Sequence, residues 1–309
     1  MLILFLGKHH GPRHLEDVNL RQAITLLALL TVSTANGLTI VGYDPATNDR
    51  FASGYPSSPA ANTSVSFLGN GYDLSGVGWN PANTTQSFTM ISNQYFVYSN
   101  HYGPSSSMNF FSPALGSVIS RDVSSTSYNF TFNGQVSDFA IGKLSAALTP
   151  ADGIAAYPVL YAPTIQPYLG LQVLNYGHGS NGPRLGMNLV DAYGSFNFPN
   201  GGTVDDSFGI GYSYNSNLSG DSMFEGGDSS SPTFVPWNGS LAMLGTHSVI
   251  ATIGSTPYSI DNFIPFYLDQ MALNGVDFSV IVVPEPSRTM LLLLGACALL
   301  RRRHRAPRE

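Results

Sequence analysis

The chain has 309 residues, of which only 10% are charged, and it contains 32 glycines, 20 prolines and one cysteine. So many glycines and prolines exclude a helical bundle, the 43% hydrophobic content excludes a disordered chain, and one cysteine excludes a disulfide framework or a thiolate metal cluster. Residues 36–283 carry four basic and fifteen acidic side chains, a net charge of −11. Four scattered cations cannot neutralise a phosphate backbone, so we expect no nucleic acid partner.

The N-terminus has the order of a secretion signal. Arg21 precedes the apolar run Ala23–Val32, and the small residues Ser33–Ala35 follow that run. A charged flank, a short apolar stretch and a small-residue site are typical of a signal peptide. We therefore expect residues 1–35 to be a signal peptide with an extended n-region, which the secretion machinery removes by cleavage after Ala35.

The body of the chain predicts short strands separated by glycine, asparagine, serine and proline. The clearest candidates are Phe88–Ile91 and Tyr95–Tyr98 on either side of Ser92–Gln94, then Tyr128–Phe132, Leu169–Tyr176 and Leu241–Ile253. Strands this short with regular turn signals favour an all-β antiparallel barrel or sandwich. One helix is expected after Ser259, because apolar residues keep a helical spacing there until Gly275.

The first residue with catalytic potential is His101, at the end of the predicted hairpin of residues 88–98. Imidazole can accept a proton and return it near neutral pH, as an acid–base catalyst must. The body contains two further histidines, His178 and His247. Neither ends an apolar hairpin, and we expect His178 to be a loop residue.

A carboxylate candidate, Asp138, precedes the apolar segment Phe139–Leu144. A buried carboxylate beside an imidazole fixes its tautomer and stabilises the imidazolium formed during catalysis. Asp122 and Asp152 have comparable positions in the chain, but neither precedes an apolar strand that would bury it.

The candidate nucleophile is Ser229, in the segment Gly226–Phe234 with the sequence Gly-Gly-Asp-Ser-Ser-Ser-Pro-Thr-Phe. A serine hydroxyl is a poor nucleophile at neutral pH and needs a positioned base. It also needs donors where the carbonyl oxygen becomes negative, and a glycine two positions before the serine lets the backbone turn to supply them.

Together the three segments resemble those of chymotrypsin-like serine proteases. That family has Gly-Asp-Ser-Gly-[Gly/Ser]-Pro around the serine and Asp-[Ile/Leu]-Ala-[Leu/Val] at the aspartate, and the order His, Asp, Ser excludes the α/β-hydrolase and subtilisin arrangements. The resemblance implies a catalytic triad of His101, Asp138 and Ser229, with the N–H groups of Gly227 and Ser229 as oxyanion donors. Ser230 departs from the family, which has glycine at this position.

The resemblance covers about residues 50–275 and implies a fold of two antiparallel six-stranded β-barrels with a C-terminal helix. The first barrel is expected at about 50–150 and the second at about 165–275, within a protease domain of residues 36–283. The implied partner is a protein or peptide substrate. We expect no cofactor and no metal, because the sequence has neither a His-Glu-x-x-His motif nor a dense calcium-binding loop.

The resemblance also points to the lining of a primary substrate pocket. The residues at the matching positions are Met223, Phe224, His247 and Ser248. Without an aspartate at the pocket base, a preference for Arg or Lys is not expected. An imidazole at 247 suits an acidic side chain, Met223 and Phe224 suit an apolar one equally well, and Ser248 has the alternative role of orienting Asp138.

The C-terminal residues 284–309 have three parts: Pro284-Glu285-Pro286, the apolar run Thr289–Leu300 and the arginine-rich segment Arg301–Arg305. A dozen apolar residues fall short of the ~20 that a spanning helix needs, and the arginines favour the cytoplasmic side. This tail resembles the PEP-CTERM sorting signal of Gram-negative bacteria. The resemblance implies export, a transient inner-membrane anchor, processing by an exosortase, and a final location at the cell surface or in the extracellular matrix.

A second function is compatible with the sequence. The same fold can serve as a catalytically inactive, protease-like surface or matrix protein. Ser230, the acidic body and the Asn-rich loops favour this alternative. A carbohydrate-binding β-sandwich has only the abundance of tyrosine and asparagine in its favour.

Overall fold

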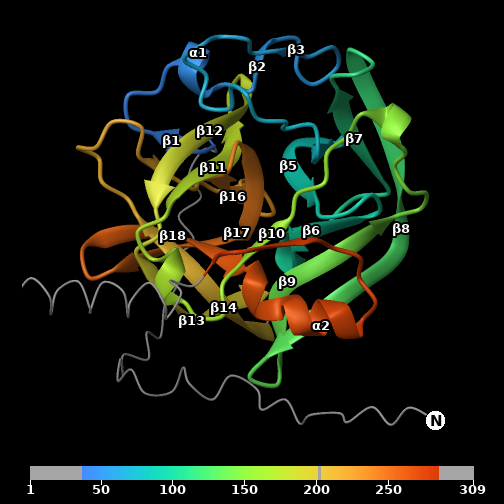
Figure 1. Cartoon of the computed structure of the whole chain (residues 1–309). Helices are drawn as coiled ribbons and strands as arrows, with labels where there is room; N and C mark the ends of the chain where they lie inside the picture. Colours follow the sequence, from blue (N-terminus) through green and yellow to red (C-terminus); the bar gives the residue numbers. More distant parts are fainter. Residues whose placement is uncertain (1–36, 201–202, 285–309) are drawn as a thin grey trace, which may run out of the picture.

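The structure is a computed structural model that describes residues 37–200 and 203–284 (Figure 1). The expected signal peptide, and the sorting signal apart from Pro284, lie outside the described residues. Within the described part, no helix is long and apolar enough to cross a bilayer.

Six strands of the first half close into an antiparallel barrel in the order β4-β5-β6-β9-β8-β7. They are β4 (Val77–Asn80), β5 (Asn83–Met90), β6 (Tyr95–Ser99), β7 (Ser107–Ser112), β8 (Ser117–Phe132) and β9 (Gln135–Leu144). The barrel interior is filled by buried apolar side chains, among them Phe88, Phe96 and Phe110. Gly142 in β9 makes room for Phe96, since a Cβ there would come within 2.2 Å of its ring. The predicted first barrel is confirmed.

The second half forms one sheet of nine strands. They are β10 (Val159–Tyr161), β11 (Gln172–Gly179), β12 (Gly182–Leu189), β13 (Ala192–Asn200), β14 (Thr203–Ser213), β16 (Pro232–Trp237), β17 (Ser240–Ile253), β18 (Thr256–Phe263) and β19 (Val280–Val282). The main path is β12-β11-β16-β17-β18-β14-β13, and β10 pairs in parallel with β17 and β19. The all-β class is confirmed. The prediction of a second six-stranded barrel is wrong in detail, because the β13–β14 hairpin extends the sheet beyond β18 and because β10 and β19 add to it.

Short elements lie outside the barrel and the nine-stranded sheet. They are β1 (Thr39–Ile40), which pairs with β15 (Ser222–Met223), β2 (Phe51–Ser53), which pairs with β3 (Ala60–Ala61), and α1 (Pro45–Asn48). The C-terminal helix is present but begins later than expected. Residues up to Phe263 pair with neighbouring strands, a 3₁₀ turn follows at Ile264–Tyr267, and α2 (Leu268–Leu273) ends just before Gly275, whose φ is +68°.

The barrel and the second sheet pack against each other over a shared core (Figure 1). Strand β9 faces both sides: Ala140 and Leu144 line the barrel interior, while Phe139 and Ile141 belong to the core between the sheets. The ring of Phe139 stacks on that of Tyr267, with centroids 4.8 Å apart. Burial on both faces explains why this segment reads as a nearly continuous apolar run.

Candidate active site

The pairing of β6 with β9 brings His101 to Asp138. Ser99, the last residue of β6, lies opposite Phe139 in β9. His101 lies in the 3₁₀ turn Asn100–Tyr102 that follows β6, and Asp138 precedes Phe139. Its Oδ1 accepts hydrogen bonds from the backbone N–H of His101 at 3.0 Å and from Nδ1 of the ring at 2.8 Å.

Ser229 approaches the imidazole from the second half of the chain, in the loop between β15 and β16. Its Oγ lies 2.9 Å from Nε2 of His101. Because the carboxylate of Asp138 accepts the Nδ1 proton, Nε2 is the nitrogen that accepts from the hydroxyl. The three residues predicted as a triad therefore form one continuous hydrogen-bonded chain.

The second oxygen of Asp138 is held by the second sheet. Oδ2 accepts a hydrogen bond from the hydroxyl of Ser248 in β17 and one of 3.3 Å from the side-chain amide of Asn262 in β18. Asp138 is fully buried, so these donors replace the water that a carboxylate would otherwise bind. Of the two roles considered for Ser248, its contact corresponds to the orientation of Asp138. No local motif marked Asn262, because strand pairing alone brings it here.

The backbone that precedes Ser229 is arranged as a donor loop. Gly227 has a φ of +104°, a backbone conformation that only glycine adopts without steric strain. Asp228 pins the loop to its surroundings, since its carboxylate accepts from the N–H groups of His178 (2.8 Å) and Glu225 (2.9 Å). Burial raises the pKa of Asp228 to about 6. Among the described residues, the N–H groups of Gly227 and Ser229 donate to no protein atom, so both are available to a negative oxygen.

Ser230, the departure from the family pattern, has a structural explanation. Its φ is +72°, a left-handed conformation that is strained for a residue with a Cβ. The side chain is fully buried, accepts from the N–H of Ser99 at 2.9 Å and donates to the carbonyl of Tyr102 at 2.9 Å. The serine hydroxyl thus ties the Ser229 loop to both ends of the turn that holds His101, a contact that sequence reasoning missed.

The predicted primary pocket is filled by its own lining. The ring of Phe224, 2% exposed, stacks on the imidazole of His247 with centroids 3.4 Å apart. Nδ1 of His247 lies 2.7 Å from Asp261 Oδ1, and Nε2 lies 2.8 Å from the carbonyl oxygen of Tyr176. The expectation that this imidazole faces an acidic substrate side chain does not agree with these contacts, since both nitrogens are occupied. Met223 of β15 pairs with Thr39 of β1 instead.

His178 also differs from expectation. It belongs to β11 rather than to a loop, and it is 3% exposed. Burial, with the positive charges of Arg50 and Arg184, lowers its pKa to about 3, so the ring is neutral at physiological pH. In the described residues, no group of three or more His, Cys, Asp or Glu side chains is arranged to hold a metal ion.

No family model and no curated protein matches the chain. Among solved structures, it is similar to the NS6 protease of murine norovirus 1, with 14% identity over 66% of this chain and 96% of that one and a TM-score of 0.39. It is also similar to the active form of the Rv3671c protease of M. tuberculosis, with 14% identity over 66% and 81% of the two chains and a TM-score of 0.42.

Proposed function

We propose that the protein is a serine endopeptidase that cleaves peptide bonds through a Ser–His–Asp triad and an acyl-enzyme. The observation that carries the proposal is the ring of His101, which lies within hydrogen-bonding distance of Asp138 on one side and of Ser229 on the other. The N–H groups of Gly227 and Ser229 have no protein acceptor in the described part of the chain, which supports the proposal independently.

In the proposed reaction, Ser229 Oγ attacks the peptide carbonyl while Nε2 of His101 takes the hydroxyl proton. Asp138 holds Nδ1–H and stabilises the imidazolium, and the N–H groups of Gly227 and Ser229 stabilise the oxyanion. When the tetrahedral intermediate collapses, His101 gives the proton to the leaving nitrogen and the acyl-enzyme remains. Water then repeats the sequence and releases the acid.

The decisive experiment compares wild type with Ser229→Ala in fluorophosphonate labelling and peptide hydrolysis. We expect Ser229→Ala to abolish labelling and to reduce kcat by about 10⁶-fold, as for nucleophile removal in other serine hydrolases. Ser231→Ala is the matched control, because its hydroxyl has no hydrogen-bond partner among the described residues. Wild-type protein that is folded but takes no label would favour the inactive surface or matrix protein.

We further propose that the protein is exported and that its tail is removed at Pro284-Glu285-Pro286. The order of small-residue site, apolar run and arginines in the sequence supports this proposal. Mass spectrometry of the protein from its native cells should find a mature N-terminus at Asn36 and no residues from the arginine-rich tail. A mature protein that retains Arg301–Arg305 would contradict sorting by this signal.

A further inference from the structure

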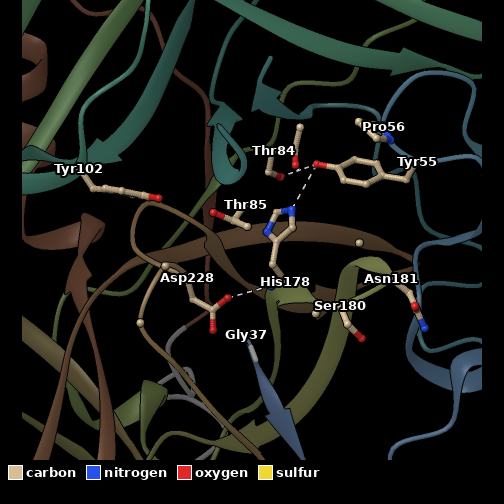
Figure 2. A pocket seen from close by; sticks show the side chains of 14 residues that line it. Gly37, Tyr55, Pro56, Thr84, Thr85, Tyr102, His178, Ser180, Asn181 and Asp228 are labelled. Carbon is tan, nitrogen blue, oxygen red and sulfur yellow. Dashed lines mark hydrogen bonds between the residues drawn. The ribbon is translucent and has the colours of Figure 1, made fainter. Parts of the chain in front are cut away.

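A cavity of about 560 Å³ opens beside the loop that carries Ser229 (Figure 2). Its lining includes Gly226, Gly227 and Asp228 of that loop, together with Thr85 of β5 and Tyr102. A volume of this size is within the range of sites that bind small molecules or large side chains, roughly 300–1,000 Å³. The cavity is therefore large enough for a substrate group next to the proposed nucleophile.

The position of the cavity assigns it to the leaving side of the substrate. In the proposed reaction the leaving nitrogen takes its proton from His101, so the segment that departs passes the turn holding that residue. Tyr102, which follows His101 directly, lines the cavity. The pocket expected for the acyl side is occupied by Phe224 stacked on His247. This cavity therefore offers space for side-chain recognition after the scissile bond.

His178, which lines the cavity, has a buried ring nitrogen that no donor of the described residues reaches. Tyr55 donates its hydroxyl proton to the carbonyl of Thr84 at 2.5 Å, and its oxygen lies 3.3 Å from Nε2 of His178. Nε2 of the neutral ring therefore carries the proton, and Nδ1 is a bare acceptor. Nδ1 is buried and has no hydrogen-bond partner among the described residues. Figure 2 shows this edge of the ring turned away from Tyr55, toward Thr85.

The surroundings of Nδ1 favour a neutral donor over a cation. The positive charges of Arg50 and Arg184 act on the His178 ring, and they would repel an ammonium or guanidinium group. The carboxylate of Asp228 already accepts two backbone N–H groups. Tyr55, Pro56 and Tyr102 supply apolar and aromatic surface. Tyrosine and tryptophan combine an aromatic ring with a single polar donor.

We propose that this cavity binds a tyrosine or tryptophan side chain of the substrate on the C-terminal side of the scissile bond, with Nδ1 of His178 accepting its hydrogen bond. The inference rests on the proposed function, because it assumes that Ser229 forms an acyl-enzyme. It makes His178 a specificity-determining residue that takes no part in bond cleavage.

Acyl transfer tests the cavity on the wild-type protein. A reactive ester acylates Ser229, and the amides of tyrosine, tryptophan, phenylalanine, lysine and alanine then compete with water for the acyl group. We expect the tyrosine and tryptophan amides to be acylated about tenfold more efficiently than phenylalanine amide, which corresponds to one neutral hydrogen bond. Lysine and alanine amides should be poorer still. Equal partition for tyrosine and phenylalanine amides overturns the proposal, whatever the variants do.

Two variants locate the effect on Nδ1. His178→Phe keeps a ring but removes the acceptor, and should reduce the tyrosine-to-phenylalanine ratio to about one. His178→Asn keeps an acceptor near the Nδ1 position and should retain a preference for tyrosine. A ratio that stays at the wild-type value in His178→Phe overturns the assignment. Failure of the ester to acylate Ser229 in folded wild-type protein is a different outcome, which refutes the proposed function itself.

Discussion

The hydroxyl of Ser230 should hold the two halves of the proposed catalytic chain in register. The residue is strained at φ +72° and joins Ser99, which precedes the turn of His101, to Tyr102, which ends it. Replacing it with alanine keeps the strain and removes both hydrogen bonds. Replacing it with glycine removes the same bonds but also relieves the strain.

The expected magnitudes follow from these contacts. Two neutral hydrogen bonds contribute about 1 kcal/mol each, and a buried N–H left without an acceptor costs about 1–3 kcal/mol. We therefore expect Ser230→Ala to lower the free energy of unfolding by about 2–3 kcal/mol. A left-handed residue with a Cβ is strained by about 1–2 kcal/mol. Ser230→Gly should therefore be about 1 kcal/mol more stable than Ser230→Ala, although both remain less stable than wild type.

The assay combines urea denaturation with the rate of fluorophosphonate labelling. Proton transfer needs Nε2 and Oγ at hydrogen-bonding distance, so both variants should label at least about tenfold more slowly than wild type under conditions where all three proteins are folded. Ser231→Ala should label at the wild-type rate. The reasoning is refuted if Ser230→Ala keeps wild-type stability and labelling rate, or if the glycine variant is the less stable of the two.

Two further substitutions test buried groups near the site. Phe224→Ala should destabilise the protein by about 3–5 kcal/mol in urea denaturation, because removal of a fully buried ring leaves a cavity. The substitution should also increase cleavage after large residues, because it opens the primary pocket. Unchanged specificity would show that Phe224 does not block this pocket. The pKa of His178 is about 3 in the fold against 6.5 when exposed. Between these pH values the unfolded chain binds a proton that the folded chain does not. The free energy of unfolding therefore decreases as the pH falls from 6.5 toward 3. The loss is about 3 kcal/mol at pH 4 and approaches about 5 kcal/mol at pH 3, and His178→Phe should regain it relative to wild type in urea denaturation. Parallel pH profiles for the two proteins would exclude His178 as the cause.

Local patterns were sufficient for most of the fold. Apolar segments on either side of Ser92–Gln94 predicted β5 and β6, and Leu241–Ile253 predicted β17 almost to the residue. The helix start was wrong, because the helical spacing after Ser259 coincides with residues that pair as β18. The β13–β14 hairpin was missed as an extension of the sheet, since nothing local distinguishes a strand that closes a barrel from one that lengthens an open edge.

The contrast between local patterns and long-range pairing also separates the site residues that the sequence predicted from those that it did not. His101, Asp138 and Ser229 each have a local context that could be read directly. Asn262 contacts Asp138 only through the pairing of β18 with its neighbours, and the stacking of Phe224 on His247 depends on packing between distant segments. A sequence pattern can therefore nominate groups for chemistry, but it does not say which side chains occupy the space around them.

Each side of the proposed triad is held by the opposite half of the molecule. Asp138 of the barrel takes two of its donors, Ser248 and Asn262, from the second sheet, and the turn of His101 is tied to the Ser229 loop through Ser230. A shift of one sheet against the other would break these bonds before it exposed much of the core between them. Activity should consequently be lost at lower denaturant concentration than the secondary structure, because alignment of the triad depends on contacts across the interface, whereas each sheet keeps its own hydrogen bonds.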